Sequence, residues 1–185
     1  MPDSLTLRRY GAGDVDLHLG TLVDTWADAH AAHPDTAHPD IADAGFTPAA
    51  LRRQITGHAR RDDFTLITAY ADGHLIGYGY DFRCTPAYWY GEALLPHITP
   101  EDAHTTTALA GICELAVRPG RQGHCIGTRI HQGLLDAMPS WVSLLAMPGA
   151  TSQHLYRRLG YQYAGPYKTG PDGPELDLLL PHTSP

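Results

Sequence analysis

Apolar residues recur with two spacings along this 185-residue chain, and each spacing predicts a different kind of element. Short runs rich in leucine, isoleucine, valine and aromatic residues predict strands, whereas apolar residues three or four positions apart predict helices. The two patterns alternate along the chain. The predicted strands cover residues 5–10, 64–71, 74–82, 109–117, 141–146, 161–167 and 176–180.

Local signals mark where several of these elements begin and end. Asp72-Gly73 separates two predicted strands and is a strong signal for a tight hairpin. Thr47-Pro48 predicts an N-cap followed by proline in the first turn of a helix. A helix with an apolar stripe begins at about Asp14, and another runs from residue 126 to Pro139.

Residues 113–128 carry the most specific chemical signal, with the sequence Cys-Glu-Leu-Ala-Val-Arg-Pro-Gly-Arg-Gln-Gly-His-Cys-Ile-Gly-Thr. A strand-like run stops at a proline, crosses a loop rich in glycine and basic residues, and enters helical periodicity. Backbone N–H groups in such a loop, next to a helix N-terminus, suit a phosphate or pyrophosphate. The Lys-Ser/Thr pair of a nucleotide P-loop and the G-x-G-x-x-G pattern are both absent.

The stretch resembles the acetyl-CoA motif of the GCN5-related N-acetyltransferase (GNAT) superfamily, which has Gln or Arg, two residues, Gly, one residue, and Gly or Ala. The matching positions here are Gln122, Cys125 and Gly127. Cys125 departs from the motif and puts a Cβ where the family's glycine lets the backbone approach the pyrophosphate. Residues 152–161 resemble the family's late helix, in which Thr151 or Ser152 is expected to cap the start and Gly160 to follow the end.

The resemblance implies a fold, a cofactor and a set of binding residues. The implied fold is a single α/β sandwich domain over residues 1–185, with a central mixed, mostly antiparallel sheet flanked by helices. The cofactor is acetyl-CoA, and the strand segment before the loop is expected to offer its backbone groups to the pantetheine. The implied cofactor-binding residues are Leu115, Ala116, Val117, Gln122, Gly123, His124, Cys125, Ile126, Gly127 and Thr128.

Acyl transfer to an amine needs a group that takes a proton from the amine and one that protonates the leaving thiolate. By resemblance, Tyr156 is the general acid. Glu114 is the best candidate base, because a carboxylate in an otherwise apolar strand must find a partner or raise its pKa. Structural pairing of Glu114 with an arginine is equally open. Asp81 and His104 are weaker alternatives.

Residues 83–107 form a long connection that contains Trp89, Tyr90 and Glu92. Loops of this length are usually functional or mobile. The two aromatic rings are candidates for the wall of an acceptor pocket, with Glu92 as a candidate to bind the amine, or else the rings pin the loop to the protein. The histidines of residues 30–45 are expected to lie in a surface loop, and no metal site is expected.

The composition of the chain indicates which classes of partner and which cellular location to expect. The formal net charge is −7 and Lys168 is the only lysine, so nucleic acid is an unexpected partner. No run of 18 apolar residues predicts a membrane span, and the first residues do not resemble a signal peptide, which favours the cytoplasm. Three cysteines without metal-ligand spacing predict free thiols.

The sequence therefore predicts an acetyl-CoA-dependent N-acetyltransferase acting by direct transfer on a small-molecule primary amine, such as an antibiotic, polyamine or amino-acid-like metabolite. Two alternatives stay open. The acceptor is a peptide or protein N-terminus, or the chain is a catalytically silent acyl-CoA-binding regulatory protein. A homodimer is also left open. An acyl-cysteine intermediate on Cys125 is not expected, because the pyrophosphate loop lies far from the acetyl carbon in this family.

Overall fold

The computed structural model describes residues 5–31, 47–84, 91–97, 109–138, 141–168 and 173–181. The chain divides into two compact units, each made of two segments. The prediction of one domain over the whole chain stays a prediction. The first unit comprises Met1–Asp81 and Glu114–Ala137, and the second comprises Phe82–Cys113 and Met138–Pro185.

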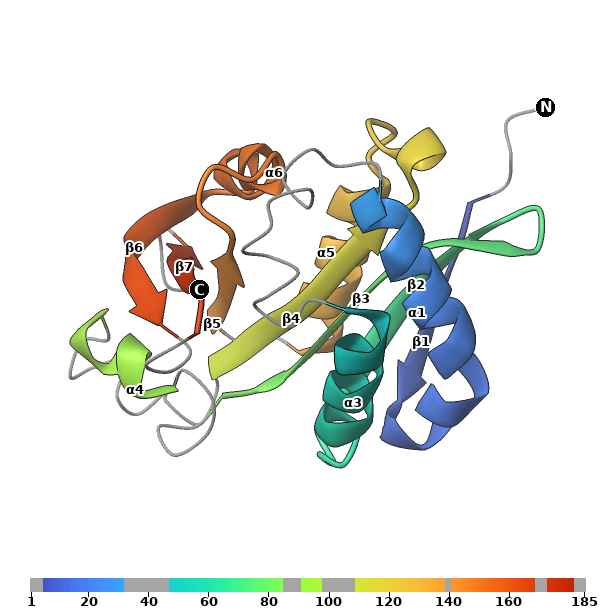
Figure 1. Cartoon of the computed structure of the whole chain (residues 1–185), viewed down its shortest axis with the longest axis horizontal. Helices are drawn as coiled ribbons and strands as arrows, with labels where there is room; N and C mark the ends of the chain where they lie inside the picture. The colour runs from blue at the N-terminus through green and yellow to red at the C-terminus, as the bar shows by residue number, and fades with distance from the viewer. Residues whose placement is uncertain are drawn as a thin grey trace. The chain divides into compact units, whose positions relative to one another are not determined.

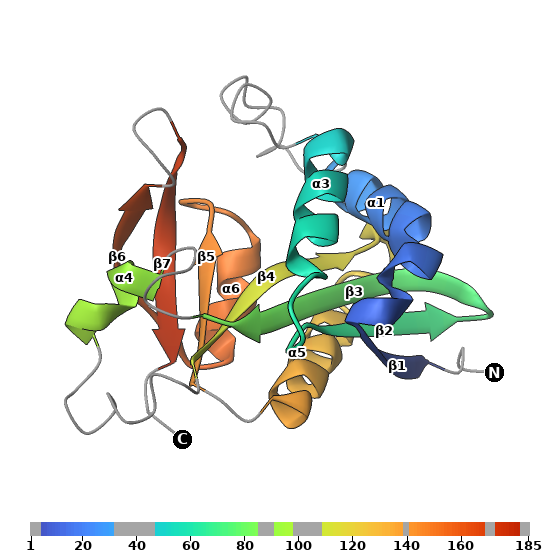
Figure 2. The same ribbon diagram turned by 90° about the horizontal axis from the view of Figure 1, so that it is seen from below.

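The first unit is a sheet with helices on both faces. β1 pairs antiparallel with β2, and β2 pairs antiparallel with β3. Helices α1 and α3 lie side by side over one face of these strands, whereas α5 covers the other face (Figures 1 and 2). The elements are β1 (Thr6–Gly11), η1 (Ala12–Asp14), α1 (Val15–Ala31), α3 (Pro48–His58), β2 (Thr65–Ala71), β3 (His74–Arg83), β4 (Leu109–Val117), η5 (Pro119–Arg121) and α5 (Ile126–Ala137).

Two glycines of β3 let this strand pass close to its neighbours. A Cβ added at Gly77 would lie 2.9 Å from the carbonyl oxygen of Ala116 on β4. A Cβ added at Gly79 would lie 2.9 Å from Cγ2 of Ile130 on α5 and 3.0 Å from Cδ1 of Leu115. Since both distances of 2.9 Å are shorter than carbon atoms tolerate, only glycine fits here. The close approach fixes β4 and α5, which flank the loop identified in the sequence.

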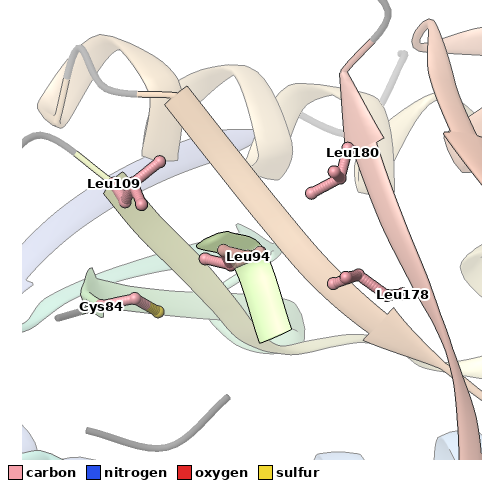
Figure 3. Close-up of a cluster of buried hydrophobic side chains, with 5 residues drawn as sticks. All are labelled: Cys84, Leu94, Leu109, Leu178 and Leu180. Carbon is pink, nitrogen blue, oxygen red and sulfur yellow. The ribbon is translucent and has the colours of Figure 1, made fainter. Parts of the chain in front are cut away.

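The second unit contains the remaining strands. The first half of β4 pairs parallel with β5, β5 pairs antiparallel with β7, and β7 pairs antiparallel with β6. Its buried cluster joins side chains from α4, β4 and β7 with one cysteine: Cys84, Leu94, Leu109, Leu178 and Leu180 (Figure 3). The further elements are α4 (Gly91–Leu94), η3 (Leu95–His97), β5 (Trp141–Ala146), α6 (Ser152–Arg158), β6 (Tyr161–Lys168) and β7 (Glu175–Pro181).

The predicted fold class is confirmed. The strands follow one another in the order β1-β2-β3-β4-β5-β7-β6, mixed and mostly antiparallel, with helices flanking them. All seven strand predictions agree with the structure to within one residue at each end. Asp72 and Gly73 make the predicted hairpin, with φ of 51° and 78°. Among the described residues, no helix is long and apolar enough to cross a bilayer.

Two capping predictions have different outcomes. Thr47 caps α3 as expected, because its Oγ1 accepts a hydrogen bond from the backbone N–H of Ala50 at 3.1 Å. Thr151 stands at the N-cap of α6, but its backbone is helical, with φ −58° and ψ −30°, and its side chain makes no capping hydrogen bond. The prediction that Thr151 or Ser152 caps this helix is therefore wrong, since a capping side chain typically stands on an extended backbone and Ser152 is already the first residue of α6.

Candidate active site

The loop between β4 and α5 is held firmly where it leaves the sheet. The backbone N–H of Arg118 donates to Ile76 of β3 at 2.9 Å. Its guanidinium donates to the carbonyl oxygen of Leu75 at 2.9 Å and to Oγ1 of Thr25 on α1 at 3.2 Å, and it forms an ion pair with Asp28. One arginine thus joins the end of β4 to both β3 and α1.

Further along, the loop folds back on itself before α5 begins. Nε2 of Gln122 donates to the carbonyl oxygen of Val117 at 2.9 Å, and the ring nitrogen Nδ1 of His124 lies 2.8 Å from the carbonyl oxygen of Gln122. Gly123 and Cys125 both have left-handed backbones, with φ of 77° and 60°. A cysteine in this region is uncommon, because its Cβ crowds the following carbonyl group.

This geometry fits the pyrophosphate of a coenzyme A. The 12-residue helix α5 starts at Ile126, and the N–H groups of its first turn have no carbonyl partners within the helix. Those N–H groups and the positive end of the helix dipole favour an anion beside the loop. The sequence-predicted loop residues, 122–128, all lie on this turn or in the first turn of α5. Ala116, on the strand before the loop, is buried.

Glu114 lies on β4, two residues before the buried Ala116, and is half-buried. Burial raises the pKa of its carboxyl from 4.5 to about 7, although hydrogen bonds from the backbone of Leu115 and the side chain of Trp26 act in the opposite direction. Its partners are therefore an amide and an indole. The alternative of structural pairing with an arginine is not what the described residues show, and Arg118 pairs with Asp28 instead. A carboxyl with this pKa can exchange a proton near neutral pH.

Asp81, the weaker candidate base, lies on the opposite face of the sheet. It is fully buried, and neither carboxylate oxygen has a hydrogen-bonding partner on another residue that the structure describes. Burial raises its pKa from 3.8 to about 8, while the charge of Arg9 lowers it and that of Asp63 raises it. Residues two positions apart on a strand point to the same face, so Asp81 points with Gly79 toward the face that α5 covers. His104 lies outside the described residues.

The sequence analysis did not predict a polar cluster between α3 and β3. The hydroxyl of Tyr80 lies 2.9 Å from Nε2 of Gln54 and 3.1 Å from Nδ1 of His58. Burial and the charge of Arg61 lower the pKa of His58 to about 4, so this ring is neutral at physiological pH. Tyr78, two residues before Tyr80, is also fully buried. The alternation Gly-Tyr-Gly-Tyr at 77–80 was the signal that could have revealed these two rings.

In the second unit, Tyr156 lies on α6 and is 7% exposed, with its ring edge-to-face against Tyr161 at a centroid distance of 6.0 Å. Gln153, one helical turn earlier, is also buried. Its Nε2 donates to the carbonyl oxygen of Met147 at 2.9 Å and to Oδ2 of Asp177 on β7 at 2.7 Å. These bonds fix α6, and with it the backbone of Tyr156, against β7 and the turn after β5.

The predicted acceptor residues are only partly described. Trp89 and Tyr90 lie outside the described residues, and Glu92 is exposed on the four-residue helix α4. The prediction of a surface loop is wrong for His30, which lies in α1. Its ring stacks on Trp26 with ring centroids 4.2 Å apart, and its Nδ1 lies 2.8 Å from the carbonyl oxygen of Trp26. No group of three His, Cys, Asp or Glu residues that could hold a metal is found within the described ranges.

Similar folds are found among solved structures. A PaiA N-acetyltransferase from Thermoplasma acidophilum, in complex with coenzyme A, is 14% identical with a TM-score of 0.57, over 96% of this chain and 99% of that chain. An aminoglycoside acetyltransferase in complex with coenzyme A is 18% identical with a TM-score of 0.58, over 96% of this chain and 95% of that chain. The ribosomal-protein-S18-alanine N-acetyltransferase from Escherichia coli is 14% identical with a TM-score of 0.59, over 98% of this chain and 96% of that chain.

Sequence comparison decides the family. No match was found among curated proteins. The sequence model described as "Acetyltransferase (GNAT) family" matches residues 24–161, which is more than half of the chain. This match includes β4, the loop at residues 118–125, α5 and α6, the segments that carry the candidate site residues Glu114, Gln122 and Tyr156. The chain therefore belongs to the GNAT family of acetyltransferases, with acetyl-CoA as its cosubstrate.

Proposed function

We propose that this acetyltransferase transfers its acetyl group to the nitrogen of a primary amine carried by a small molecule, such as an antibiotic, a polyamine or an amino-acid-like metabolite. The observation that carries the proposal is Glu114, a carboxyl with a pKa of about 7 on the strand that leads into the anion-binding loop. An amine is protonated at neutral pH and must lose a proton before it attacks. A base with a pKa near 7 suits that task.

The proposed chemistry uses three parts of the chain. Bound acetyl-CoA supplies a thioester, whose carbonyl carbon accepts the nucleophile. Glu114 takes a proton from the ammonium, directly or through water, and the backbone amide of Leu115 or Ala116 stabilises the charge that develops on the carbonyl oxygen. The C–N bond forms and the C–S bond breaks. The sulfur leaves with the electron pair of the C–S bond and takes a proton from Tyr156, and the nitrogen, which loses its second proton as the amide forms, returns a proton to Tyr156 through water.

The remaining binding residues keep the roles that the family resemblance implies. The backbone groups of Leu115, Ala116 and Val117 would hold the pantetheine, and the turn at residues 122–128 would hold the pyrophosphate. Trp89, Tyr90 and Glu92 are proposed to line the acceptor pocket. We further propose that the protein works in the cytoplasm without a membrane or nucleic-acid partner, and a homodimer is compatible with this function.

The acceptor is the part of the proposal that most needs a test. The similar folds include one named for an aminoglycoside and one named for a ribosomal-protein alanine, so this fold serves small and macromolecular acceptors. A net charge of −7 favours cationic amines over acidic acceptors. This argument supports polyamines and aminoglycosides as the first compounds to try.

Thiol release from acetyl-CoA, measured against a panel of amines and N-terminal peptides, tests the proposal. We expect turnover with a small amine, and kcat lower by about 10²-fold or more in Tyr156→Phe. Tyr163→Phe is the matched control, because Tyr163 is exposed on β6 and loses the same hydroxyl. Turnover only with peptides would move the acceptor to the peptide class. Calorimetric binding of acetyl-CoA without turnover on any acceptor would favour the silent regulatory protein.

A further inference from the structure

Strand β3 carries two buried tyrosines whose hydroxyl groups differ in their hydrogen bonding. Tyr78 and Tyr80 are both fully buried, and because they stand two positions apart on one strand they share a face. The hydroxyl of Tyr80 has two partners on α3, Gln54 and His58. The hydroxyl of Tyr78 has no hydrogen-bonding partner within the part of the chain that the structure describes. Buried polar groups are rarely left so, since an unmade hydrogen bond destabilises the fold.

The strand geometry places the side chains of Tyr78 and Glu114 on the same face of the sheet. A Cβ at Gly79 would lie 3.1 Å from the carbonyl oxygen of Glu114 and would point toward Leu115 and α5. By alternation on both strands, the side chains of Tyr78 and Glu114 therefore point to the other face, which α1 and α3 cover (Figure 2). The hydrogen bond from Trp26 of α1 to Glu114 agrees with this placement.

The electrostatics agree with this neighbourhood. Burial raises the pKa of Tyr78 well above its usual value, and the next largest cause is the charge of Glu114, followed by Tyr80. Of the other titratable groups on this face, His58 on α3 is neutral and bound to Tyr80, and His30 on α1 stacks on Trp26. Asp28 of α1 is paired with Arg118 at the end of β4. Glu114 is thus the charged acceptor within electrostatic reach of the Tyr78 hydroxyl.

We propose that Tyr78 is a positioning residue for the base: its hydroxyl donates a hydrogen bond to one water molecule, which in turn donates to the Glu114 carboxylate and stabilises its ionised form. This inference rests on the proposed role of Glu114. A carboxylate accepts up to four hydrogen bonds, of which Trp26 and the Leu115 backbone supply two. A third donor offsets part of the cost of burying the charge and keeps the carboxyl able to accept a proton near neutral pH.

The test is a direct titration of Glu114 by ¹³C NMR in protein labelled at glutamate. The chain has only four glutamates, Glu92, Glu101, Glu114 and Glu175, and Glu114→Gln identifies the signal by its loss. We expect Tyr78→Phe to raise the pKa of Glu114 by about 0.5–1 unit, because the charged form loses a hydrogen-bond donor. Tyr80→Phe removes the same atom from the same face and is expected to leave the pKa within about 0.2 unit.

The opposite result has its own signature. If the Tyr78 hydroxyl is only an unpaired polar group, its removal stabilises the fold and leaves the titration of Glu114 unchanged, and thermal unfolding of Tyr78→Phe would show this gain. An equal shift in both tyrosine variants would also overturn the proposal, since it would reflect a general change in burial.

The pH profile of kcat/KM separates this inference from the proposed function. If the wild-type protein turns over, its acid limb should follow the NMR titration and move upward in Tyr78→Phe. An NMR shift in a protein that shows no turnover supports the contact and contradicts the proposed function. Turnover with an unmoved titration in Tyr78→Phe overturns the contact and leaves the function standing.

Discussion

Replacing Asp81 by asparagine should stabilise this protein, and the gain should grow with pH. Asparagine has nearly the shape of a protonated aspartic acid, but it cannot ionise. The carboxyl of Asp81 is fully buried on β3, without a hydrogen-bonding partner on another residue in the described ranges, and burial raises its pKa from 3.8 to about 8. The folded protein therefore holds a proton on Asp81 at pH values where the unfolded chain has lost it.

The sign follows from this proton. Between about pH 4 and pH 8 the native state binds more protons than the unfolded state, so the free energy of unfolding falls as the pH rises. Below this window both states are protonated, and above it both are ionised. The shift of 8 − 3.8, about 4.2 units, corresponds to about 6 kcal/mol at most. Relaxation around a buried charge reduces this, and we expect Asp81→Asn to gain about 2–5 kcal/mol at pH 8.5 and little at pH 4.5.

Urea unfolding at several pH values measures this gain. Asp24→Asn is the matched control, because Asp24 is exposed on α1 and its replacement should change stability by no more than about 0.5 kcal/mol. A stability difference between Asp81→Asn and the wild type that is constant from pH 4.5 to pH 8.5 would refute the reasoning. Acetyl transfer should persist in Asp81→Asn, since the base proposed above lies on the other face of the sheet.

Three further predictions concern the loop, α6 and β3. Cys125→Gly removes a Cβ from a left-handed position and should tighten acetyl-CoA binding in calorimetry by about two- to tenfold, whereas weaker binding would contradict the assigned crowding. Gln153→Leu leaves Asp177 and the Met147 carbonyl without their donor, so urea unfolding should show a loss of about 2–4 kcal/mol, and a loss below about 1 kcal/mol would mean that the contacts contribute little. Gly77→Ala should destabilise the fold by about 1–3 kcal/mol, because the added Cβ would collide with the carbonyl oxygen of Ala116. As a control, Gly20→Ala on α1, where no atom lies near the added Cβ, should stabilise the fold by about 1 kcal/mol. Equal melting temperatures of the two variants would contradict this prediction.

Local signals in the sequence predicted most of the fold and the loop. The hairpin at Asp72-Gly73, the Thr47 cap and the strand–loop–helix order around residues 109–137 each depend on a few neighbouring residues, and the structure confirms them. The perturbed Glu114 was also predictable, because one carboxylate interrupts an apolar strand. Its partner was not predictable. Trp26 is 88 positions away in the sequence, and only the packing of α1 on the sheet brings it to Glu114.

The sequence could not identify the buried polar groups of β3. Its residues from Leu75 to Phe82 are all buried, so the strand lacks the alternation of polar and apolar residues that normally distinguishes a solvent-exposed face from a buried face. The sequence therefore offered Asp81 only as a weaker candidate base and gave no prediction for Tyr78. The surroundings of both groups depend on which side chains α1, α3 and α5 place beside the strand, and no short sequence pattern encodes that.

The bonds of Arg118 have a consequence for how this protein opens. Its guanidinium is bound by Thr25 and Asp28 of α1 and by the Leu75 carbonyl of β3, so the loop cannot leave the sheet without breaking charge-assisted contacts to both elements. In amide hydrogen exchange, the middle of α1, the start of β3 and the end of β4 should then exchange as one cooperative unit. Neutralising this arginine would divide that unit, and the amides around residue 118 would exchange faster than those of α1.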